Sequence, residues 1–404
     1  MPAPVTLPRD DNATGRDLGA EEIALLTEVI RSGTLSETKG TMVRRLERGF
    51  AELHGVAHCH AMNSGTASLH AAFAALNLEP GTEIITTSIT DMGALTPIIY
   101  QGAIPIFADV DPDTYNVTAE TIEPRITERT RAIVATHLFG NPCDMDAIMA
   151  LANRYKLPVI EDCSQSFLAT WRGRLVGTFG AMGCFSLQQG KHMTCGEGGL
   201  LITNDAALSR TVRLFVNKAW GYGDPKPDHY FLALNYRLSE LQGAVALAQL
   251  GKLKSVVSRR QRAAAKLDAG LANIPGIHTP VVREGASDVY WKYPVQVDER
   301  TLGTDLSTYA KRLADLGLIV MPRYIQKPAF MCEVLRDRRT LGTSQFPFKY
   351  AGSDRVVPPY NEAEYPGTLR ALSRVLVVPM NEFFEDKHIE FICSTFKEAA
   401  GMAA

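Results

Sequence analysis

Apolar residues recur at helical spacing near the start of the chain. Segment 20–32 has this pattern, and segment 40–53 places Val43, Leu46 and Phe50 at the i, i+3 and i+7 positions of one face. Side chains at this spacing form an apolar stripe, which is typical of a helix packed on a core. The pattern therefore predicts two amphipathic helices in the first part of the chain.

Further along, short apolar runs alternate with helical patterns. The runs typical of buried strands are 83–87, 104–110, 132–138 and 157–163. The helical patterns are 66–76, 91–102, 116–127 and 144–156. Such alternation predicts an α/β layer with a mostly parallel sheet. Ligands of these folds bind at the carboxyl ends of the strands, so residues that follow each run are candidates for a site.

The pattern also divides the chain into three parts. Residues 1–18 are polar and contain prolines, which predicts an N-terminal arm or a disordered tail. A large domain is predicted at 19–256, ending in a long amphipathic helix, and a smaller α/β domain at 257–404. The elements predicted in the smaller domain are strands 291–297 and 375–378 and helix 306–316. The basic run 252–262 is mixed with Ser, Val and Ala, and is predicted to be a solvated helix face.

Composition narrows the class of protein. A chain of 404 residues, 46% hydrophobic and 21% charged, is ordinary for a soluble globular protein with two cores. A net charge of −2 gives no electrostatic footprint for nucleic acid or an anionic membrane. No stretch approaches the roughly 18 apolar residues that span a bilayer, and the N-terminus has no apolar signal-peptide core. Seven cysteines without a C-x-x-C pair favour a reducing compartment, so we expect a cytoplasmic protein.

An acid and a lysine are the first candidates for chemistry. Asp162 ends the apolar run 157–160, and Lys191 follows in a turn rich in Gly, Ser and Gln. Pyridoxal phosphate (PLP) needs an amine to hold its aldehyde as a Schiff base and a carboxylate to keep its pyridine nitrogen protonated. The pair makes PLP a candidate cofactor. Taken alone, an Asp and a Lys are more often a helix cap and a solvated loop lysine, because loop lysines are mostly exposed.

A possible phosphate site lies earlier in the chain. The motif Ser-Gly-Thr at 64–66 opens a predicted helix, whose free N–H groups and dipole favour an anion. A plain N-cap is the alternative interpretation. The His-Cys-His motif at 58–60 does not predict a metal site, because neighbouring residues on a strand point to opposite faces.

Three motifs of the central block resemble the signature of the DegT/DnrJ/StrS-type aminotransferases. They are EDCSQS at 161–166, FSLQQGK at 185–191 and GEGG at 196–199. The resemblance runs from about Gly33 to the C-terminus, in the family's order and spacing. It implies a fold-type I PLP enzyme in which Lys191 forms the Schiff base. Related sugar 3-dehydratases have histidine in place of this lysine, so its presence argues against that group.

The resemblance assigns further cofactor contacts residue by residue. Asp162 matches the acid that pairs with the pyridine nitrogen, and Gln165 matches a residue near the phenolic oxygen. Gly65 and Thr66 match the turn that holds the phosphate, which the hydroxyl of Ser186 supports.

One cofactor contact departs from the family. Its members have an aromatic residue near position 91 that stacks on the pyridine ring, whereas this chain has Asp91 and Met92. A thioether can lie flat against a ring, so Met92 is expected to cover it. Asp91 is expected to cap the helix that follows.

Two later segments resemble substrate contacts. Segment 235–242 resembles the motif N-x-R-x-x-E-x-Q, in which the Asn reaches the phosphate bound by the neighbouring subunit. This implies a homodimer with shared sites, Asn235 as a cofactor contact, and Arg237 as a contact to the donor carboxylate or the acceptor hydroxyls. A structural salt bridge is the alternative for Arg237. Tyr324 resembles an acceptor contact, with a packed tyrosine as the alternative, and an insert at 336–365 is expected either to shape acceptor specificity or to decorate the surface.

The implied reaction is transamination from L-glutamine or L-glutamate to a keto-cyclitol or keto-sugar. The run QQGKHMTCGEGG is most similar to the subset that acts on keto-cyclitols such as scyllo-inosose in aminocyclitol antibiotic pathways. Nucleotide-linked keto-sugars and a dehydration like that of the 3-amino-5-hydroxybenzoate synthases remain open. A PLP-binding metabolite sensor is the hypothesis from another class, although no DNA-binding domain is visible. Catalysis needs a neutral Lys191, so we expect burial and a positive pyridinium to lower its pKa.

Overall fold

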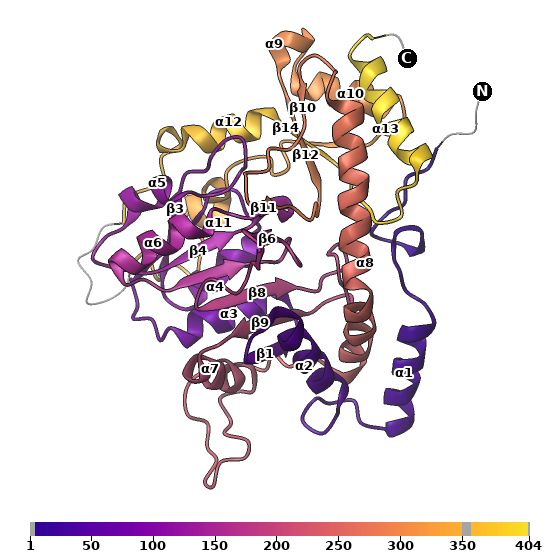
Figure 1. Ribbon diagram of the computed structural model, residues 1–404. Coiled ribbons are helices and arrows are strands. Elements are labelled where there is room, and N and C mark those ends of the chain that lie inside the picture. The colour runs from indigo at the N-terminus through magenta and orange to yellow at the C-terminus, as the bar shows by residue number, and fades with distance from the viewer. Residues whose placement is uncertain (1–4, 350–356, 403–404) are drawn as a thin grey trace.

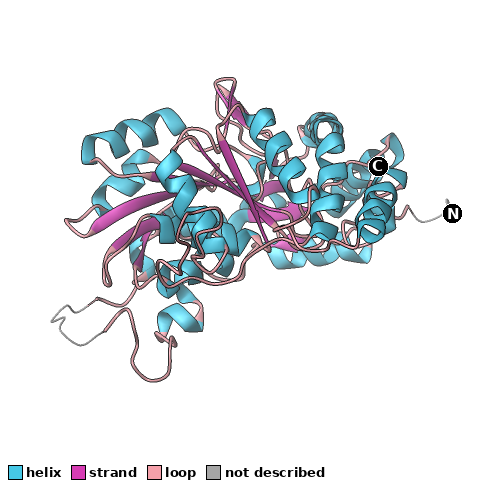
Figure 2. Cartoon of the chain, turned by 90° about the horizontal axis from the view of Figure 1, so that it is seen from below, coloured by secondary structure: helices cyan, strands magenta, loops and turns pink. Residues whose placement is uncertain are grey.

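The protein is described by a computed structural model over residues 5–349 and 357–402. A seven-stranded sheet lies between layers of helices, and a second, four-stranded sheet lies beyond it (Figure 1). Viewed from below, the strands of the large sheet cross the interior with helices on both sides (Figure 2). This is the α/β architecture expected from the alternating pattern.

The large sheet is mostly parallel. Its strands are β1 (His58–Met62), β2 (Glu83–Thr87), β3 (Ile104–Ala108), β4 (Thr130–Thr136), β5 (Val159–Asp162), β8 (Met182–Ser186) and β9 (Gly199–Thr203). They lie in the order β1-β9-β8-β5-β4-β2-β3, and only the pairs that include β9 are antiparallel. The four predicted strands are all present, three of them with ends that differ from the prediction.

The described chain has seven helices before the long helix α8 (Glu240–Leu271), and all of them except α1, which packs on α8, lie against this sheet or its edge. They are α1 (Ala20–Ser32), α2 (Met42–His54), α3 (Gly65–Ala75), α4 (Thr96–Tyr100), α5 (Ala119–Ile122), α6 (Met145–Tyr155) and α7 (Ala206–Val216). The helices predicted at 91–102 and 116–127 are wrong in length, because each is replaced by one short helix and one 3-10 turn. Pro97 and Pro124 lie at these junctions, and neither has the N–H that continues a preceding helix.

Helix α8 (Glu240–Leu271) is much longer than the predicted helix that ends at 256. It runs from α1 and α2 at one end to α13 (Asp386–Ala399) at the other (Figure 1). Position 256, the predicted domain boundary, therefore falls inside one continuous helix. The boundary itself stays a prediction, but the connection across it is rigid rather than a linker.

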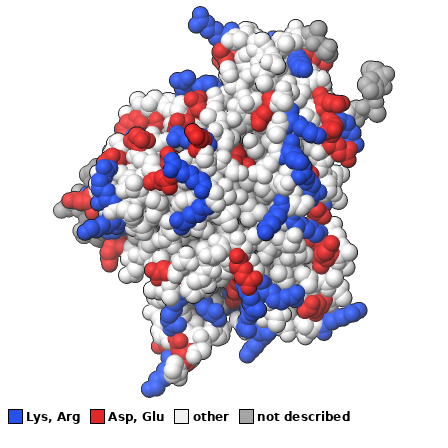
Figure 3. Space-filling view, viewed as in Figure 1, with Lys and Arg blue, Asp and Glu red and all other residues white. Residues whose placement is uncertain are grey.

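The basic run on this helix is the predicted solvated face only in part, because Lys254 and Arg262 are exposed whereas other members of the run are paired with acids. Lys252 lies 3.0 Å from the carboxylate of Glu22, and Arg260 is fully buried with its guanidinium 2.7 Å from Glu382. In Figure 3, Lys, Arg, Asp and Glu side chains are spread over the visible face, and blue side chains gather in a stripe along the course of α8. The long-range acidic partners of Lys252 and Arg260 are not revealed by the local sequence.

The smaller sheet is antiparallel in the order β10-β12-β14-β13. Its strands are β10 (Ile277–His278), β12 (Tyr293–Val297), β13 (Met321–Pro322) and β14 (Val375–Val378). The helices that follow α8 are α9 (Glu299–Leu302), α10 (Leu306–Asp315), α11 (Glu333–Arg336), α12 (Pro366–Arg374) and α13. A small sheet, β11 (Ala286–Ser287), β6 (Thr170–Trp171) and β7 (Arg174–Leu175), joins the two parts. The predicted strands and helix of this region are all present.

The predicted insert 336–365 is described except for residues 350–356, which lie outside the described chain. Phe348 and Tyr365 pack in one apolar cluster with Phe107 of β3. The described part of the insert is therefore attached to the edge of the large sheet.

The start of α8 stabilises α2 through one carboxylate. Glu240 is 2% exposed and accepts hydrogen bonds from the backbone N–H of Thr41, Met42 and Val43 at 2.8, 2.7 and 3.1 Å. These groups begin α2 and have no partner inside that helix. A charge-assisted cap of this kind is worth more than a neutral one.

We therefore expect Glu240→Ala to lower the free energy of unfolding by about 2–3 kcal/mol in urea denaturation, because three N–H groups lose their acceptor. The matched control is Glu52→Ala on the exposed side of α2, which should change it by less than about 0.5 kcal/mol. Equal losses in the two variants would contradict this account of the cap.

Candidate active site

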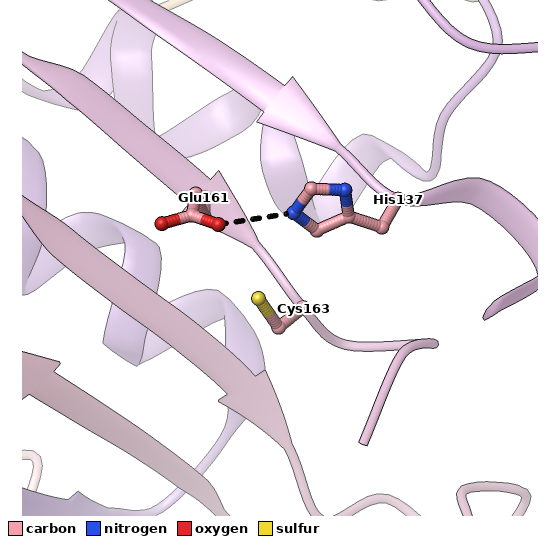
Figure 4. Close-up of side chains that lie close together, drawn as sticks. All are labelled: His137, Glu161 and Cys163. Atoms are coloured by element: carbon pink, nitrogen blue, oxygen red, sulfur yellow. Dashed lines mark hydrogen bonds and ion pairs between the residues drawn. The ribbon is translucent and has the colours of Figure 1, made fainter. Parts of the chain in front are cut away.

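The carboxyl end of β5 is held by a buried acid. Glu161 is fully buried and accepts hydrogen bonds from the backbone N–H of Gly177, Phe179 and Gly180, each at 2.7 Å. His137 lies 3.3 Å from the same carboxylate (Figure 4). The other ring nitrogen of His137 accepts the N–H of Cys143 at 3.0 Å, so the nitrogen facing Glu161 is the one that donates.

The thiol of Cys163 completes this cluster, in which the three ligand-type atoms lie within 4.8 Å of one another. The carboxylate and the imidazole already have protein hydrogen-bond partners. The cluster therefore acts as a hydrogen-bonded support that fixes the end of β5. No local sequence pattern predicts this cluster, because His137 follows β4 whereas Glu161 and Cys163 lie at the end of β5.

Asp162 is the next residue, so its side chain points to the opposite face of the sheet from Glu161. It is 5% exposed, and within the described chain its carboxylate accepts one hydrogen bond, from the N–H of Ser164 at 3.1 Å. A buried carboxylate with spare acceptor capacity at a strand end can receive a cationic N–H from a ligand.

Lys191 lies in the turn between β8 and β9. Backbone hydrogen bonds from Leu187 to Gly198 and from Gln189 to Gly196 close this turn. The amine of Lys191 lies 4.1 Å from the centroid of the Trp291 ring, and the indole N–H of Trp291 donates to the carbonyl of Gly190 at 2.8 Å. Trp291 thus holds both the lysine side chain and its backbone.

The surroundings change the proton affinity of this lysine. Burial lowers the pKa of Lys191 to about 8, although the negative charges of Asp162 and Asp91 act in the opposite direction. About half of the amine is therefore neutral near pH 8. The lowering by burial agrees with the expectation from the sequence.

The predicted phosphate turn and Ser186 come together. Ser64 caps α3 by accepting the N–H of Ala67 at 3.0 Å, while the N–H groups of Gly65 and Thr66 have no acceptor within the described chain. A Cβ on Gly65 would lie 2.6 Å from that of Ser186, so only glycine fits between the helix and β8. Free donors at the start of an 11-residue helix fit a phosphate.

Gln165 and Tyr324 form a pair. The amide of Gln165 donates to the Tyr324 hydroxyl at 3.2 Å, and its oxygen accepts the N–H of Phe139 at 2.7 Å. Burial raises the pKa of Tyr324 to about 12, so the hydroxyl keeps its proton near neutral pH. Tyr324 has a φ of +53°, and strained backbone of this kind is concentrated at functional sites. Its ring packs edge-on against Phe139 and Trp291.

Residues 91–93 lie beside the phosphate turn. A Cβ on Gly93 would lie 2.5 Å from the Thr66 hydroxyl, so the two segments touch. Asp91 accepts the N–H of Gly93 at 2.7 Å, which is the capping role expected for it. Met92 is partly buried against the apolar cluster of Leu95, and its contact with the cofactor ring stays a prediction.

Asn235 and Arg237 lie along the edge of the large sheet. Asn235 is exposed and forms an isolated bridge with Asn217, and Arg237 forms one with Met62 of β1. The guanidinium of Arg237 donates to the Asn217 side chain at 3.3 Å. The salt bridge considered as an alternative for Arg237 is not among its described contacts.

The other features noted in the sequence have structural explanations. His60 contacts Ser209 at 2.8 Å, whereas Cys59 is buried in the core on the other face of β1. All seven cysteines are free thiols. Within the described residues no helix is both long and apolar enough to cross a bilayer.

The residues around Lys191 fit one class of protein, a PLP-dependent enzyme. This cofactor requires an amine, a carboxylate and a group of free N–H donors. The chain supplies them with Lys191, Asp162 and the N-terminus of α3, which lie at the carboxyl ends of β8, β5 and β1.

Comparisons with known proteins agree. The model of the DegT/DnrJ/EryC1/StrS aminotransferase family matches residues 16–359. The chain is 30% identical to the spore coat polysaccharide biosynthesis protein SpsC of Bacillus subtilis, over 94% of this chain and 95% of that one. It is 39% identical to the L-glutamine:2-deoxy-scyllo-inosose aminotransferase of Streptomyces lividus, over 70% and 69%. The X-ray structure of an aminotransferase from Psychrobacter cryohalolentis matches with a TM-score of 0.85 at 27% identity, over 96% of this chain and 98% of that one.

The chain belongs to the DegT/DnrJ/EryC1/StrS aminotransferase family. It has the fold of the fold-type I PLP enzymes and is a PLP-dependent aminotransferase. The family and cofactor implied by the sequence motifs are thereby confirmed.

The lowered pKa of Lys191 can be measured in the cofactor-free protein. Acylation by a small amine-reactive reagent should rise with a midpoint near pH 8, because only the neutral amine reacts. The midpoint of an ordinary lysine is about 10.4. Peptide mass spectrometry measures the extent of acylation of Lys191 and of the exposed lysines in the same sample, so the two can be compared at each pH.

Asp162→Asn should move this midpoint to lower pH, because the carboxylate stabilises the protonated amine. A Lys191 midpoint near that of the exposed lysines, or an upward shift in Asp162→Asn, would contradict the described environment.

Proposed function

We propose that this protein transfers an amino group from L-glutamine or L-glutamate to the ketone of a cyclitol or sugar. The observation that carries the proposal is the amine of Lys191, which has a lowered pKa and is within electrostatic reach of Asp162. The relative from Streptomyces lividus supports glutamine as donor and a cyclitol as acceptor, because its name contains both. A cytoplasmic location fits seven free thiols.

The described residues can hold the cofactor in one orientation. The free N–H groups of Gly65 and Thr66, with the Ser186 hydroxyl, would bind the phosphate. Asp162 would accept a hydrogen bond from the ring nitrogen, and Lys191 would hold the aldehyde carbon. When bound, PLP supplies a carbon that exchanges amines and a ring that accommodates the electron pair left on the donor's α-carbon.

Lys191 is suited to moving the proton. In its neutral form the amine can take the proton from the α-carbon of the donor and then deliver it to a neighbouring carbon. The ring of Trp291 keeps the amine on one side of the turn, and its indole N–H fixes the carbonyl of Gly190. When PLP is bound, the carboxylate of Asp162 would stabilise positive charge on the ring nitrogen.

The acceptor side of the site is polar. The Tyr324 hydroxyl accepts from Gln165 and keeps its own proton free to donate. A ketone that carries several hydroxyls can be oriented by such groups. The site therefore suits a sugar or a cyclitol.

We further propose that two copies of the chain share their sites. The loop before Asn235 exposes Tyr222 (49%), Leu232 (95%) and Leu234 (51%). Several exposed apolar side chains in one loop favour its burial against a partner. A second copy would cover this loop and receive Asn235 and Arg237 near its own phosphate turn.

The donor and acceptor are tested by absorbance of the PLP-loaded protein. L-glutamine should remove the visible band of the lysine-bound cofactor, and scyllo-inosose should then restore it. Lys191→Ala should lower turnover by at least about 10³-fold, because it removes both the covalent attachment and the base.

The other outcomes assign the alternatives. If a nucleotide-linked keto-sugar restored the visible band and scyllo-inosose did not, the acceptor would be a nucleotide-linked keto-sugar rather than a cyclitol. A protein that binds PLP and responds to no amino donor would favour a metabolite sensor or a dehydration. Substantial turnover by Lys191→Ala would contradict the mechanism itself.

Shared sites are tested by mixing two inactive variants, Lys191→Ala and Arg237→Ala, after partial unfolding and refolding together. In a mixed dimer one site has both an intact Lys191 and an intact Arg237, so about a quarter of all sites should recover activity. The control is each variant refolded alone. No recovery, in a mixture shown to contain mixed dimers, would contradict shared sites.

A further inference from the structure

The N-terminal segment reaches the catalytic turn. The chain from Asp10 to Arg16 lies against the turn that carries Lys191, although 175 residues separate Arg16 and Lys191 in sequence. Arg16 is 5% exposed, and its guanidinium donates to the carbonyl of Lys191 at 2.8 Å. Residues 10–16 of the predicted arm are therefore packed against this turn.

A second contact fixes the same turn from the same segment. The carbonyl of Asp10 accepts a hydrogen bond from the side chain of Gln189 and another from the Nε of Arg16, both at 2.8 Å. The indole N–H of Trp291 holds the carbonyl of Gly190 between them. Residues 189, 190 and 191 are thus each held by a side chain or carbonyl from outside the turn.

The segment is itself anchored by a charge cluster. The carboxylate of Asp10 lies 3.3 Å from Arg260, 3.1 Å from Lys292 and 3.4 Å from Arg16. Burial acts to raise the pKa of Asp10, but these three cations outweigh it and hold the pKa below its ordinary value. Asn381 also donates to the carboxylate at 2.8 Å.

This anchor joins three parts of the fold. Arg260 comes from the middle of α8, Lys292 follows Trp291 just before β12, and Asn381 follows β14. The carbonyl of Trp291 accepts from Arg260 at 3.1 Å. The backbone of the lysine turn is therefore connected to α8 and to the small sheet through the N-terminal segment.

We propose that Arg16 is a positioning residue for Lys191. Its guanidinium fixes the Lys191 carbonyl, and through it the direction in which the amine leaves the turn. The inference rests on the proposed function, since it assigns to Arg16 the placement of the amine that moves the proton. A displacement of about 1 Å in a reacting group can cost about 10²-fold in rate.

The test compares three variants. Arg16→Met removes the donors but keeps an apolar chain of similar length, and Arg16→Lys keeps one cationic donor. Arg259→Met is the matched control, because Arg259 also holds the N-terminal segment, through Asp17 at 2.8 Å, but has no described contact with the lysine turn.

The first readout is amide hydrogen exchange of the cofactor-free protein. In Arg16→Met, the peptide that covers residues 187–196 should exchange at least about tenfold faster, whereas peptides of β4 and β5 should not change. Arg16→Lys should recover part of the protection, and Arg259→Met should match the parent protein.

The second readout is steady-state kinetics. Arg16→Met should lower kcat about 10- to 100-fold with KM changed less than about threefold, because donor and acceptor contacts are intact. The proposal would be overturned if all peptides of Arg16→Met exchanged faster while Arg16→Lys matched the parent protein in both readouts. Arg16 would then contribute to stability alone. Unchanged exchange of 187–196 together with unchanged kcat would also overturn the proposal.

The two proposals fail separately. If the parent protein transfers no amino group but Arg16→Met loosens only the lysine turn, the proposed function fails and the positional contact stands. If the parent protein is an active aminotransferase and Arg16→Met does not alter the turn or kcat, only the positioning role fails.

Discussion

The burial of one lysine amine is the constraint on which the site depends. A lysine in water is almost wholly protonated at neutral pH and cannot act as a base. In this fold the protein surrounds Lys191 and lowers its pKa to about 8, while Asp162 keeps the shift from going further. The same carboxylate thus serves two purposes, because it limits the lowering of the Lys191 pKa and can pair with the ring nitrogen of the cofactor.

Holding the amine in this environment requires rigid backbone on all sides. Glu161 fixes the end of β5 with three backbone hydrogen bonds, so Asp162 has little freedom. The carbonyls of Gly190 and Lys191 are fixed by Trp291 and Arg16. Helix α8 connects these supports, because its buried Arg260 binds both the Trp291 carbonyl and the Asp10 carboxylate. The small sheet therefore contributes to the site although the cofactor residues lie on the large one.

The features that could be predicted from the sequence are those that a local residue pattern encodes. The helix at 20–32 and the strand at 83–87 were predicted with the observed ends, because apolar spacing alone defines them. Asp162 and Lys191 could be proposed as site residues because their chemistry and their motifs are local.

The missed features depend on distant contacts. The end of α8 was placed too early, since Arg260 interrupts the apolar stripe and is buried only because Glu382 pairs with it. Trp291 and Arg16 touch residues 101 and 175 positions away, which no local pattern reveals. The stacking contact between Met92 and the cofactor ring stays a prediction.

We propose that Lys191 holds the cofactor and carries out the proton transfer. The most direct measurement is borohydride reduction of the PLP-loaded protein followed by peptide mapping. We expect a single permanently labelled lysine, Lys191, with the label absent after prior treatment with L-glutamine or L-glutamate. A label on another lysine, or a label on Lys191 that neither donor removes, would contradict it.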